Sequence, residues 1–506
     1  MRAKYIAFRL HIPNNRSIIC ANMKTERQNG LTSGNVWKVL LLYSLPLFGS
    51  AFVQQIYSLV DLLVVGNFAS NGALAVDAIG NATVVINILL AFALGANGGC
   101  SVIVAKYSGR GDKKSLIETI YTAAISYSVL CLCIMALGFG LGKISLTALD
   151  VHDIYFDDCL EYLFIYIGSL PFVFFYNLGC GICAALGDSK TPFIFLVISS
   201  ALNIGLDLLF VWGLGLGVAG AAWATFISQA ISCVLTAVIV LRKMRAIRPE
   251  QKPRAFNKLI LKRLIASSVP IILQQSFVSV GNFFVNKCIN GLDDTGDATT
   301  GFTTAFKLLV LGTMSIVSMS NGLTNYASQN LAAGEYKRAR LGFYVVLCYT
   351  TVVAIVFAVA FVCFPEFLTQ LFVQKDKLTP EALGYSVQFL STVSFFIPVV
   401  GVKIVADGFV RGCGGNLGFA VSTFADLILR VAFVYILVAA GWGFAGVCWA
   451  WAIGWGIGTA IALAFCFAHM HRIGKYDREK QALANEKTIQ SNDENAAVQI
   501  DDEKTA

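Results

Sequence analysis

The residues best suited to chemistry in this chain are ionisable and polar side chains that lie inside long apolar stretches. Asp61 lies within one such stretch, and Asn203 and Asp207 lie together within another. A charged side chain inside a membrane costs several kcal/mol unless it is paired or hydrated, so each is a functional candidate. The spacing of four residues places Asn203 and Asp207 on one face of a helix.

Thr225 can join this group because a glycine-containing turn sets its depth. The turn at residues 213–217 separates two apolar stretches, and Asp207 and Thr225 lie on either side of it. At a rise of 1.5 Å per residue, each lies about 9–12 Å from the turn along its own helix. Asp61 lies in the corresponding half of its own stretch. Two carboxyl groups, an amide and a hydroxyl could therefore converge. Such a site either holds a proton, because desolvation and crowding favour the neutral carboxyl, or coordinates a small hard cation through oxygen atoms.

The second half of the chain carries charged residues at four-residue steps, at Lys403, Asp407 and Arg411 and again at Asp426 and Arg430. Such ladders can neutralise themselves along a helix, so a structural and a functional role remain equally open for them. Lys307 lies a helical turn or two inside another apolar stretch and could line a cavity.

Apolar stretches account for most of the chain. Its 506 residues are 57% hydrophobic and 13% charged, with a mean hydropathy of +0.69, whereas soluble domains carry about 25% charge. Stretches of about 20 residues or more can cross a bilayer. We count twelve, at 39–66, 78–104, 116–142, 160–186, 193–214, 218–241, 264–291, 300–325, 341–364, 383–412, 418–440 and 444–468. They lack period-two alternation, so we predict an all-α integral membrane protein with twelve transmembrane helices.

The two halves of the chain repeat one pattern. The matching landmarks are Ser44-Leu45-Pro46 with Ser268-Val269-Pro270, Gly99 with Gly322, Gly111 with Gly334, and Gly217-Val218-Ala219-Gly220 with Gly443-Phe444-Ala445-Gly446. Each copy holds six stretches, an even number, so both copies cross the membrane in the same direction. We predict two pseudo-symmetric six-helix lobes, an N-lobe at 37–241 and a C-lobe at 264–468. Two halves that move around a site between them are the architecture of a carrier.

The positive charges predict the orientation. Most of the 38 Lys and Arg residues fall in the N-terminal arm (1–36), the tail (469–506) and the even-numbered loops, above all the basic linker at 242–263. The odd-numbered loops carry acidic residues instead, for example around Asp153 and Asp293. The positive-inside rule therefore predicts a multi-pass protein with the linker and both termini in the cytoplasm. We expect this protein in the plasma membrane. The polar composition of the tail predicts disorder.

Motifs of soluble enzymes fail in this context. Gly215-x-Gly217-x-x-Gly220 fits the dinucleotide fingerprint, but no strand precedes it and it joins two apolar stretches. The four histidines lie outside the apolar stretches, and the fourteen cysteines show no metal-ligand spacing. Topology explains the net charge of +8 without a nucleic-acid partner. We predict no enzymatic activity, no catalytic residue, no metal and no other cofactor.

At the acidic residues the chain resembles the multidrug and toxic compound extrusion (MATE) family, over roughly residues 37–468. The motifs that carry the resemblance are Pro46…Asp61…Gly66 in span one, Asn203…Asp207 in span five, Thr225 in span six, and the loops Gly109-Arg110-Gly111-Asp112 and Ser328-Gln329-Asn330…Gly334. The resemblance implies that the cation-coupling site of the N-lobe consists of Asp61, Asn203, Asp207 and Thr225. It also implies that span one bends at Pro46.

One branch of the MATE family has a glutamate in span seven, where this chain reads Gln274-Gln275-Ser276. This departure favours coupling through the N-lobe, and protons over sodium ions. An acid in span ten also occurs in part of the family, so Asp407 is the preferred candidate in the second half. A possible C-lobe cavity would combine it with Lys403, Lys307 and Gln274.

The resemblance implies a secondary antiporter that exports organic cations or drugs, driven by inward proton or sodium flow. We expect a monomer whose partners are its small-molecule substrate and membrane lipid. A related flippase or exporter of lipid-linked or anionic solutes is the alternative, and a basic cavity containing Lys307, Lys403 and Arg430 would favour it. A non-transporting receptor is a third possibility, but it would not need duplicated spans that carry acids.

Overall fold

The computed structural model of the protein describes residues 31–69, 72–149, 151–293, 295–372 and 379–505, and every regular element within them is a helix. The first half contains α1 (Val36–Phe68), α2 (Gly72–Arg110), α3 (Lys113–Ala148), η1 (Asp153–Tyr155), α4 (Phe156–Ala185), α5 (Lys190–Asp207), η2 (Leu208–Gly213) and α6 (Gly217–Ala246). The second half contains α7 (Lys258–Asn290), α8 (Asp297–Ala332), α9 (Tyr336–Cys363), α10 (Pro365–Phe372), α11 (Pro380–Val393), η4 (Ser394–Phe396), α12 (Ile397–Gly412), α13 (Asn416–Leu437), η5 (Val438–Trp442) and α14 (Gly443–Thr505).

The helices have the length and the surface of membrane spans. Within the described residues, eleven helical segments are long and apolar enough to cross a bilayer. The last of them, Asn416–Ala482, contains two of the predicted stretches. The chain turns between these two stretches at Gly441 and Gly443, which have φ angles of 87° and 53°. Large apolar side chains such as Leu132 on α3 remain exposed, as a lipid-facing surface requires. The prediction of an all-α membrane protein is confirmed.

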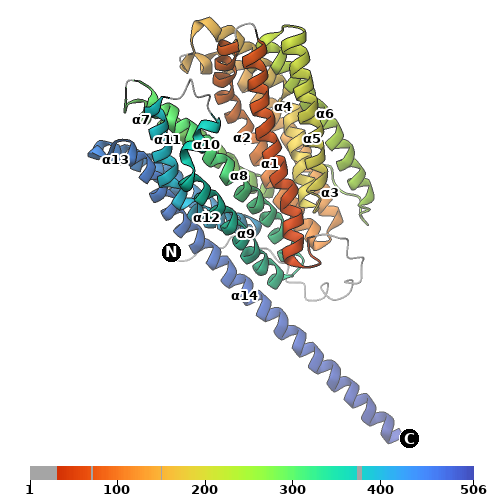
Figure 1. Cartoon of the computed structure of the whole chain (residues 1–506). Helices are drawn as coiled ribbons and strands as arrows, with labels where there is room; N and C mark the ends of the chain where they lie inside the picture. Colours follow the sequence, from red (N-terminus) through yellow and green to blue (C-terminus); the bar gives the residue numbers. More distant parts are fainter. Residues whose placement is uncertain (1–30, 70–71, 150, 294, 373–378, 506) are drawn as a thin grey trace, which may run out of the picture.

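The two halves of the chain form two helix bundles (Figure 1). One apolar core gathers mainly residues of α2, α3 and α4, and a second gathers residues of α8, α11 and α14. In Figure 1 the helices of the two bundles run close together at the end from which the tail of α14 leaves, and they diverge toward the opposite end. Residues 247–257 join α6 to α7 at the closed end, which we call the linker end, and the opposite end is the far end.

The linker between the lobes is fixed to the N-lobe. The buried carboxylate of Glu118 on α3 accepts hydrogen bonds from the backbone N–H of Arg254 (3.1 Å) and from the Asn257 side chain (2.7 Å). The Asn257 side-chain oxygen also caps α7, accepting from the backbone N–H of Leu259 at 3.0 Å. The loop between the lobes is therefore shorter than the predicted basic linker, 242–263, because the two ends of that linker belong to α6 and α7.

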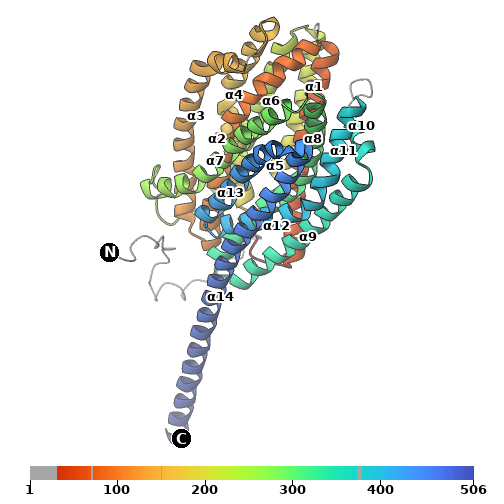
Figure 2. The ribbon, with the colours of Figure 1, turned by 90° about the vertical axis from the view of Figure 1, so that its left-hand side faces the viewer.

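Residues 1–30 of the predicted N-terminal arm lie outside the described residues. Disorder of the tail stays a prediction. In the structure, α14 continues to Thr505 and projects from the bundle (Figures 1 and 2). Polar composition removes the packing partners of a segment, but Ala, Gln, Glu and Lys are strong helix formers, so a helix that has already begun can continue through them.

Candidate functional site

The N-lobe candidates gather near the far end of their helices. Asp207 is the last residue of α5, directly before the π-helical turn η2, a feature often found at functional sites. Asn203 lies one turn earlier, and Asp61 lies in the last third of α1. Thr225 is on α6, which packs against α5. All four are buried, Asp207 completely.

The two carboxyl groups of this site are close to each other and have no cation. Asp61 and Asp207 lie within interaction distance of one another. Apart from the contact of the two acids with each other, neither oxygen of Asp207 nor Oδ1 of Asp61 has a hydrogen-bond partner among the described residues. The oxygen and nitrogen of the Asn203 amide have none either, and no ion pair among the described residues includes these acids. Two desolvated carboxylates cannot both stay charged side by side. The site therefore requires a proton or a bound cation.

Three tyrosines surround this pair, and the sequence analysis did not single them out. All three lie close enough to Asp61 to interact electrostatically with its carboxyl group: Tyr57 on α1, and Tyr162 and Tyr166 on α4. Their ring hydroxyls add polar groups to an otherwise apolar environment. The signal for Tyr57 was available, because it precedes Asp61 by one helical turn. The α4 pair shows only i, i+4 spacing, and nothing local links α4 to α1.

Pro46 lies inside α1, which continues through it from Val36 to Phe68. Because proline has no backbone N–H, the Leu42 carbonyl lacks its helical hydrogen bond. The Ser50 hydroxyl makes a separate contact in the next turn, donating to the Pro46 carbonyl at 2.9 Å. The local weakness needed for bending is present. Bending itself remains a prediction.

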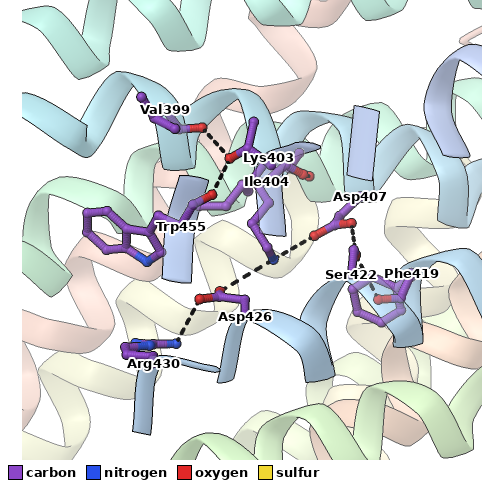
Figure 3. A network of polar contacts seen from close by, with 11 residues as sticks. Val399, Lys403, Ile404, Asp407, Phe419, Ser422, Asp426, Arg430 and Trp455 are labelled. Carbon is purple, nitrogen blue, oxygen red and sulfur yellow. Dashed lines mark hydrogen bonds and ion pairs between the residues drawn. The ribbon is translucent and has the colours of Figure 1, made fainter. Parts of the chain in front are cut away.

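The C-lobe candidates form a closed network of charges (Figure 3). The ammonium of Lys403 on α12 lies 2.9 Å from Asp407 and 3.7 Å from Asp426 on α13. Arg430 lies 3.6 Å from Asp426, and the Ser422 hydroxyl donates to Asp407 at 2.5 Å. All of these side chains are buried, so this C-lobe network holds two positive and two negative groups inside the lobe.

Helix α14 provides the space for the C-lobe network. The Arg430 guanidinium lies over the Trp451 ring, 4.2 Å from its centroid, in a cation–π contact. A Cβ atom at Gly458 would lie 2.8 Å from Cε of Lys403 and 2.9 Å from Cβ of Asp426. Glycine at this position is therefore required for the approach of α14 to the charges.

The remaining C-lobe candidates lie outside this network. Lys307 is exposed on α8 and Gln274 is half-buried on α7, and among the described residues no hydrogen bond or ion pair joins either of them to the charges. Arg411 reaches Asn321 at 3.2 Å and stacks over Phe419 instead. The structure thus joins Lys403 and Asp407 of the predicted C-lobe cavity, and adds Asp426, Arg430 and Ser422.

An all-helical membrane bundle made of two similar halves, with acids buried in both and unpaired with a cation in one of them, defines the class of multi-pass membrane transporters. The MatE family model matches residues 46–209 and again residues 270–436, once in each half, and the chain belongs to this family of multidrug efflux transporters. The two matches begin at Pro46 and Pro270, the first landmarks of the internal repeat. The resemblance drawn from the sequence is confirmed.

Known proteins agree with this assignment over nearly the whole chain. The probable multidrug resistance protein YpnP of Bacillus subtilis is 29% identical over 410 residues, covering 81% of this chain and 90% of the relative. The multidrug export protein MepA of Staphylococcus haemolyticus is 22% identical, covering 85% and 92%. The crystal structure of a MATE protein in the bent conformation superimposes with a TM-score of 0.81 at 21% identity, covering 88% of this chain and 98% of that one.

Proposed function

We propose that this protein is a secondary antiporter that exports organic cations or drugs, driven by an inward flow of protons or sodium ions through the N-lobe. The observation that carries the proposal is the Asp61–Asp207 pair, which is buried and lacks any described cationic partner. A site that needs a positive charge to be stable takes one up and releases it when its surroundings change. Protons are the preferred coupling ion, because the region of span seven where one family branch has a glutamate reads Gln274-Gln275-Ser276 in this chain.

Coupling follows from the charge of this pair. With the ion bound, the pair carries one negative charge instead of two, the repulsion between the carboxyl groups is removed, and the helices α1 and α5 can stay packed. With the ion released, the carboxylates repel each other, and α1 can respond because the hydrogen bond missing at Pro46 weakens it there. Thr225 and Asn203 would complete the oxygen and amide groups around the ion. The ion can drive export only if it binds the two conformations of the protein with different affinity.

The names of the relatives support small-molecule drugs as substrates, since YpnP and MepA are called multidrug resistance and export proteins. We further propose that the protein acts as a monomer in the plasma membrane with its linker end in the cytoplasm. The basic residues of the linker support this orientation. Ion-driven exchange needs no cofactor.

The test is efflux of a fluorescent organic cation from proteoliposomes under separately imposed proton and sodium gradients. We expect efflux driven by the proton gradient alone, and an Asp61→Asn variant at equal abundance should show none. Efflux that follows only the sodium gradient would identify sodium, and not the proton, as the coupling ion. Efflux that ignores both gradients would refute the antiport mechanism.

Orientation has its own test. Single cysteines introduced at residues 247–257 should react with an impermeant thiol reagent only from the cytoplasmic side, and cysteines beside Asp153 or Asp293 only from outside. Labelling of the linker from outside would overturn the proposed orientation, including the direction of ion flow.

Export of lipid-linked or anionic solutes is the weaker alternative. It required Lys307, Lys403 and Arg430 to form a basic cavity, but Lys403 and Arg430 are paired with Asp407 and Asp426 inside the C-lobe. This neutralisation favours organic cations. The same proteoliposome assay with an anionic dye separates the two substrate classes.

A further inference from the structure

The described hydrogen bonds between the lobes join residues at or near the linker end. Helix α2 packs against α7 and α8, and α1 packs against α8 and α9. The Ser328 hydroxyl on α8 donates to the Val102 carbonyl on α2 at 3.0 Å, and Gln329 donates to the Ala185 carbonyl at the end of α4. In Figure 1 the lobes diverge away from this end. The structure therefore represents a state closed at the linker end.

Asn325 on α8 is at the centre of these contacts. Its side-chain nitrogen donates to the Tyr43 hydroxyl on α1 at 3.1 Å, and its side-chain oxygen accepts from the Ser101 hydroxyl on α2 at 2.7 Å. The Tyr43 hydroxyl in turn donates to the Ala184 carbonyl of α4 at 2.6 Å. We call Tyr43, Ser101 and Asn325 the Asn325 bridge. A single C-lobe side chain thereby joins three N-lobe helices, and all three side chains are buried.

Close backbone contacts surround the Asn325 bridge, and one of them occurs twice. Gly99 on α2 packs against Ser268 on α7, and Gly322 on α8 packs against Ser44 on α1. These residues are equivalent in the two repeats, so the contact is repeated about the pseudo-two-fold axis, as in a symmetric dimer. A Cβ atom at Gly322 would lie 2.8 Å from the Ser44 hydroxyl, and one at Gly99 would overlap Ser268 more severely. Larger side chains at either glycine are incompatible with the closed state.

We propose that the Asn325 bridge is the latch of a gate between the lobes, which closes the linker end in this state and opens in each transport cycle. Its hydrogen bonds are between neutral groups. When the lobes separate, water can take over every donor and acceptor of the bridge, so opening leaves no buried group unsatisfied. A buried apolar cluster that joins Leu40 and Tyr43 of α1 to Leu323 of α8 lies beside the bridge and must separate with it. An ion pair at the position of the bridge would be harder to open.

The gate rests on the membership of the chain in a transporter family and on no particular coupling ion. Tyr43, Ser101 and Asn325 act as positioning residues, because they touch neither Asp61 nor Asp207 in the described contacts. They hold one conformation against another. Weakening them should shift the population of the two states without removing the ion site.

The first test measures opening directly. Ser44→Cys places a thiol in the closed contact, and its reaction with an impermeant reagent applied from the linker side is quantified at that residue by mass spectrometry in the full-length protein. Asn325→Ala or Ser101→Ala should raise the labelling rate roughly tenfold or more, as expected for the loss of one or two buried hydrogen bonds. Unchanged labelling in both variants, or increased labelling from the far side, would overturn the proposal.

Matched controls separate the latch from general loosening. Asn177→Ala and Ser126→Ala remove side chains that bond only to their own helices, at the Val173 and Thr122 carbonyls. Neither should change the labelling rate. Gly99→Val should increase labelling, whereas Gly80→Val, on the same helix with open space around it, should not. Equal effects of the two glycine variants would refute a gate at this contact.

The second test asks whether the bridge must open during transport. Oxidation of a Ser101→Cys/Asn325→Cys variant should cross-link the lobes and stop transport, and a reductant should restore it. Transport at the uncross-linked rate by fully cross-linked protein would overturn the gate. If the proposed ion-driven export itself fails, the labelling test still reports on the gate, because it needs neither substrate nor ion gradient.

Discussion

The buried carboxyl groups of the two lobes differ in whether a cationic side chain lies beside them. In the N-lobe, Asp61 and Asp207 face each other without a described cation, whereas in the C-lobe the ammonium of Lys403 lies within 4 Å of both Asp407 and Asp426. A buried acid without a partner depends on an ion from solution, and one that already has a lysine does not. The comparison assigns ion sensitivity to one half of a duplicated protein and internal charge balance to the other.

The internal repeat sharpens this contrast. When Gly217 is aligned with Gly443, the positions of Asn203, Asp207 and Thr225 correspond to Leu429, Phe433 and Trp451. These C-lobe residues are apolar or aromatic and cannot bind a cation through oxygen atoms. The C-lobe network is therefore built from other positions on α12 and α13, and the two charged sites are not copies of one another.

The largest effect is expected at the N-lobe pair. Asp61→Asn should reduce ion-driven efflux to background, because the site can no longer exchange a positive charge with solution. The measurement is efflux from proteoliposomes at equal protein abundance. Asp77→Asn, an exposed acid on α2, is the matched control and should transport normally. Wild-type efflux by the Asp61 variant would remove the distinction between the lobes.

Breaking the C-lobe network should lower the stability of the folded protein. Lys403→Met leaves two buried carboxylates with one cation and should lower the free energy of unfolding by about 3–5 kcal/mol. Adding Asp407→Asn restores the charge balance and should recover most of that loss, as measured by thermal unfolding in detergent. Asp207→Asn should not lower the unfolding temperature at all, because it removes an unpaired buried acid. A similar loss in Lys403→Met and Asp207→Asn would contradict the comparison.

A smaller, functional effect distinguishes the members of the N-lobe site. Asp207→Asn should remove most of the dependence of efflux on pH or sodium, and Asn203→Ala should weaken it only in part. Because they share one helical face and one ion or hydrogen-bond network, the double variant should be no worse than Asp207→Asn alone. Strictly additive losses in the transport assay would assign the two residues to separate sites.

The smallest effect is expected at an ion pair near the N-lobe surface. Asp188 lies in the loop between α4 and α5. Burial raises the pKa of its carboxyl group, but hydrogen bonds from Lys243 (2.8 Å) and Thr191 lower it by more, so the pKa lies below its ordinary value. The resulting stabilisation is present above the pKa of the unfolded chain, about 4, and is lost as pH falls through the folded-state pKa. Asp188→Asn should cost at most about 1 kcal/mol at pH 7.

Chemical denaturation at pH 7 and at the lowest pH that the protein tolerates would measure this difference, which should shrink on acidification. A difference that grows toward low pH would show that Asp188 is neutral in the folded protein. Such a result would make the loop acid resemble the N-lobe pair rather than the paired acids of the C-lobe.

The sequence by itself determined the helices, the duplication and the family. Span length and the repeat of glycines and prolines are properties of the local chain, and membrane insertion leaves long apolar stretches no alternative to the helix. The acids Asp61 and Asp207 were also recognisable, because a carboxyl group is costly anywhere in such a stretch. Disorder of the tail follows from its polar composition and stays a prediction, and the structure continues α14 through this segment.

Only the tertiary structure decided which side chains meet. Lys403 and Asp407 share a helix, and their pairing follows from spacing, but the contact of Lys403 with Asp426 depends on how α12 and α13 pack. The Asn325 bridge joins residues that lie far apart in the chain, and Asn325 and Ser101 look like ordinary small polar residues in the sequence. Periodicity fixes the face of a helix on which a residue lies. It carries no information about the neighbour that the face will contact, because that depends on the packing of all the helices together.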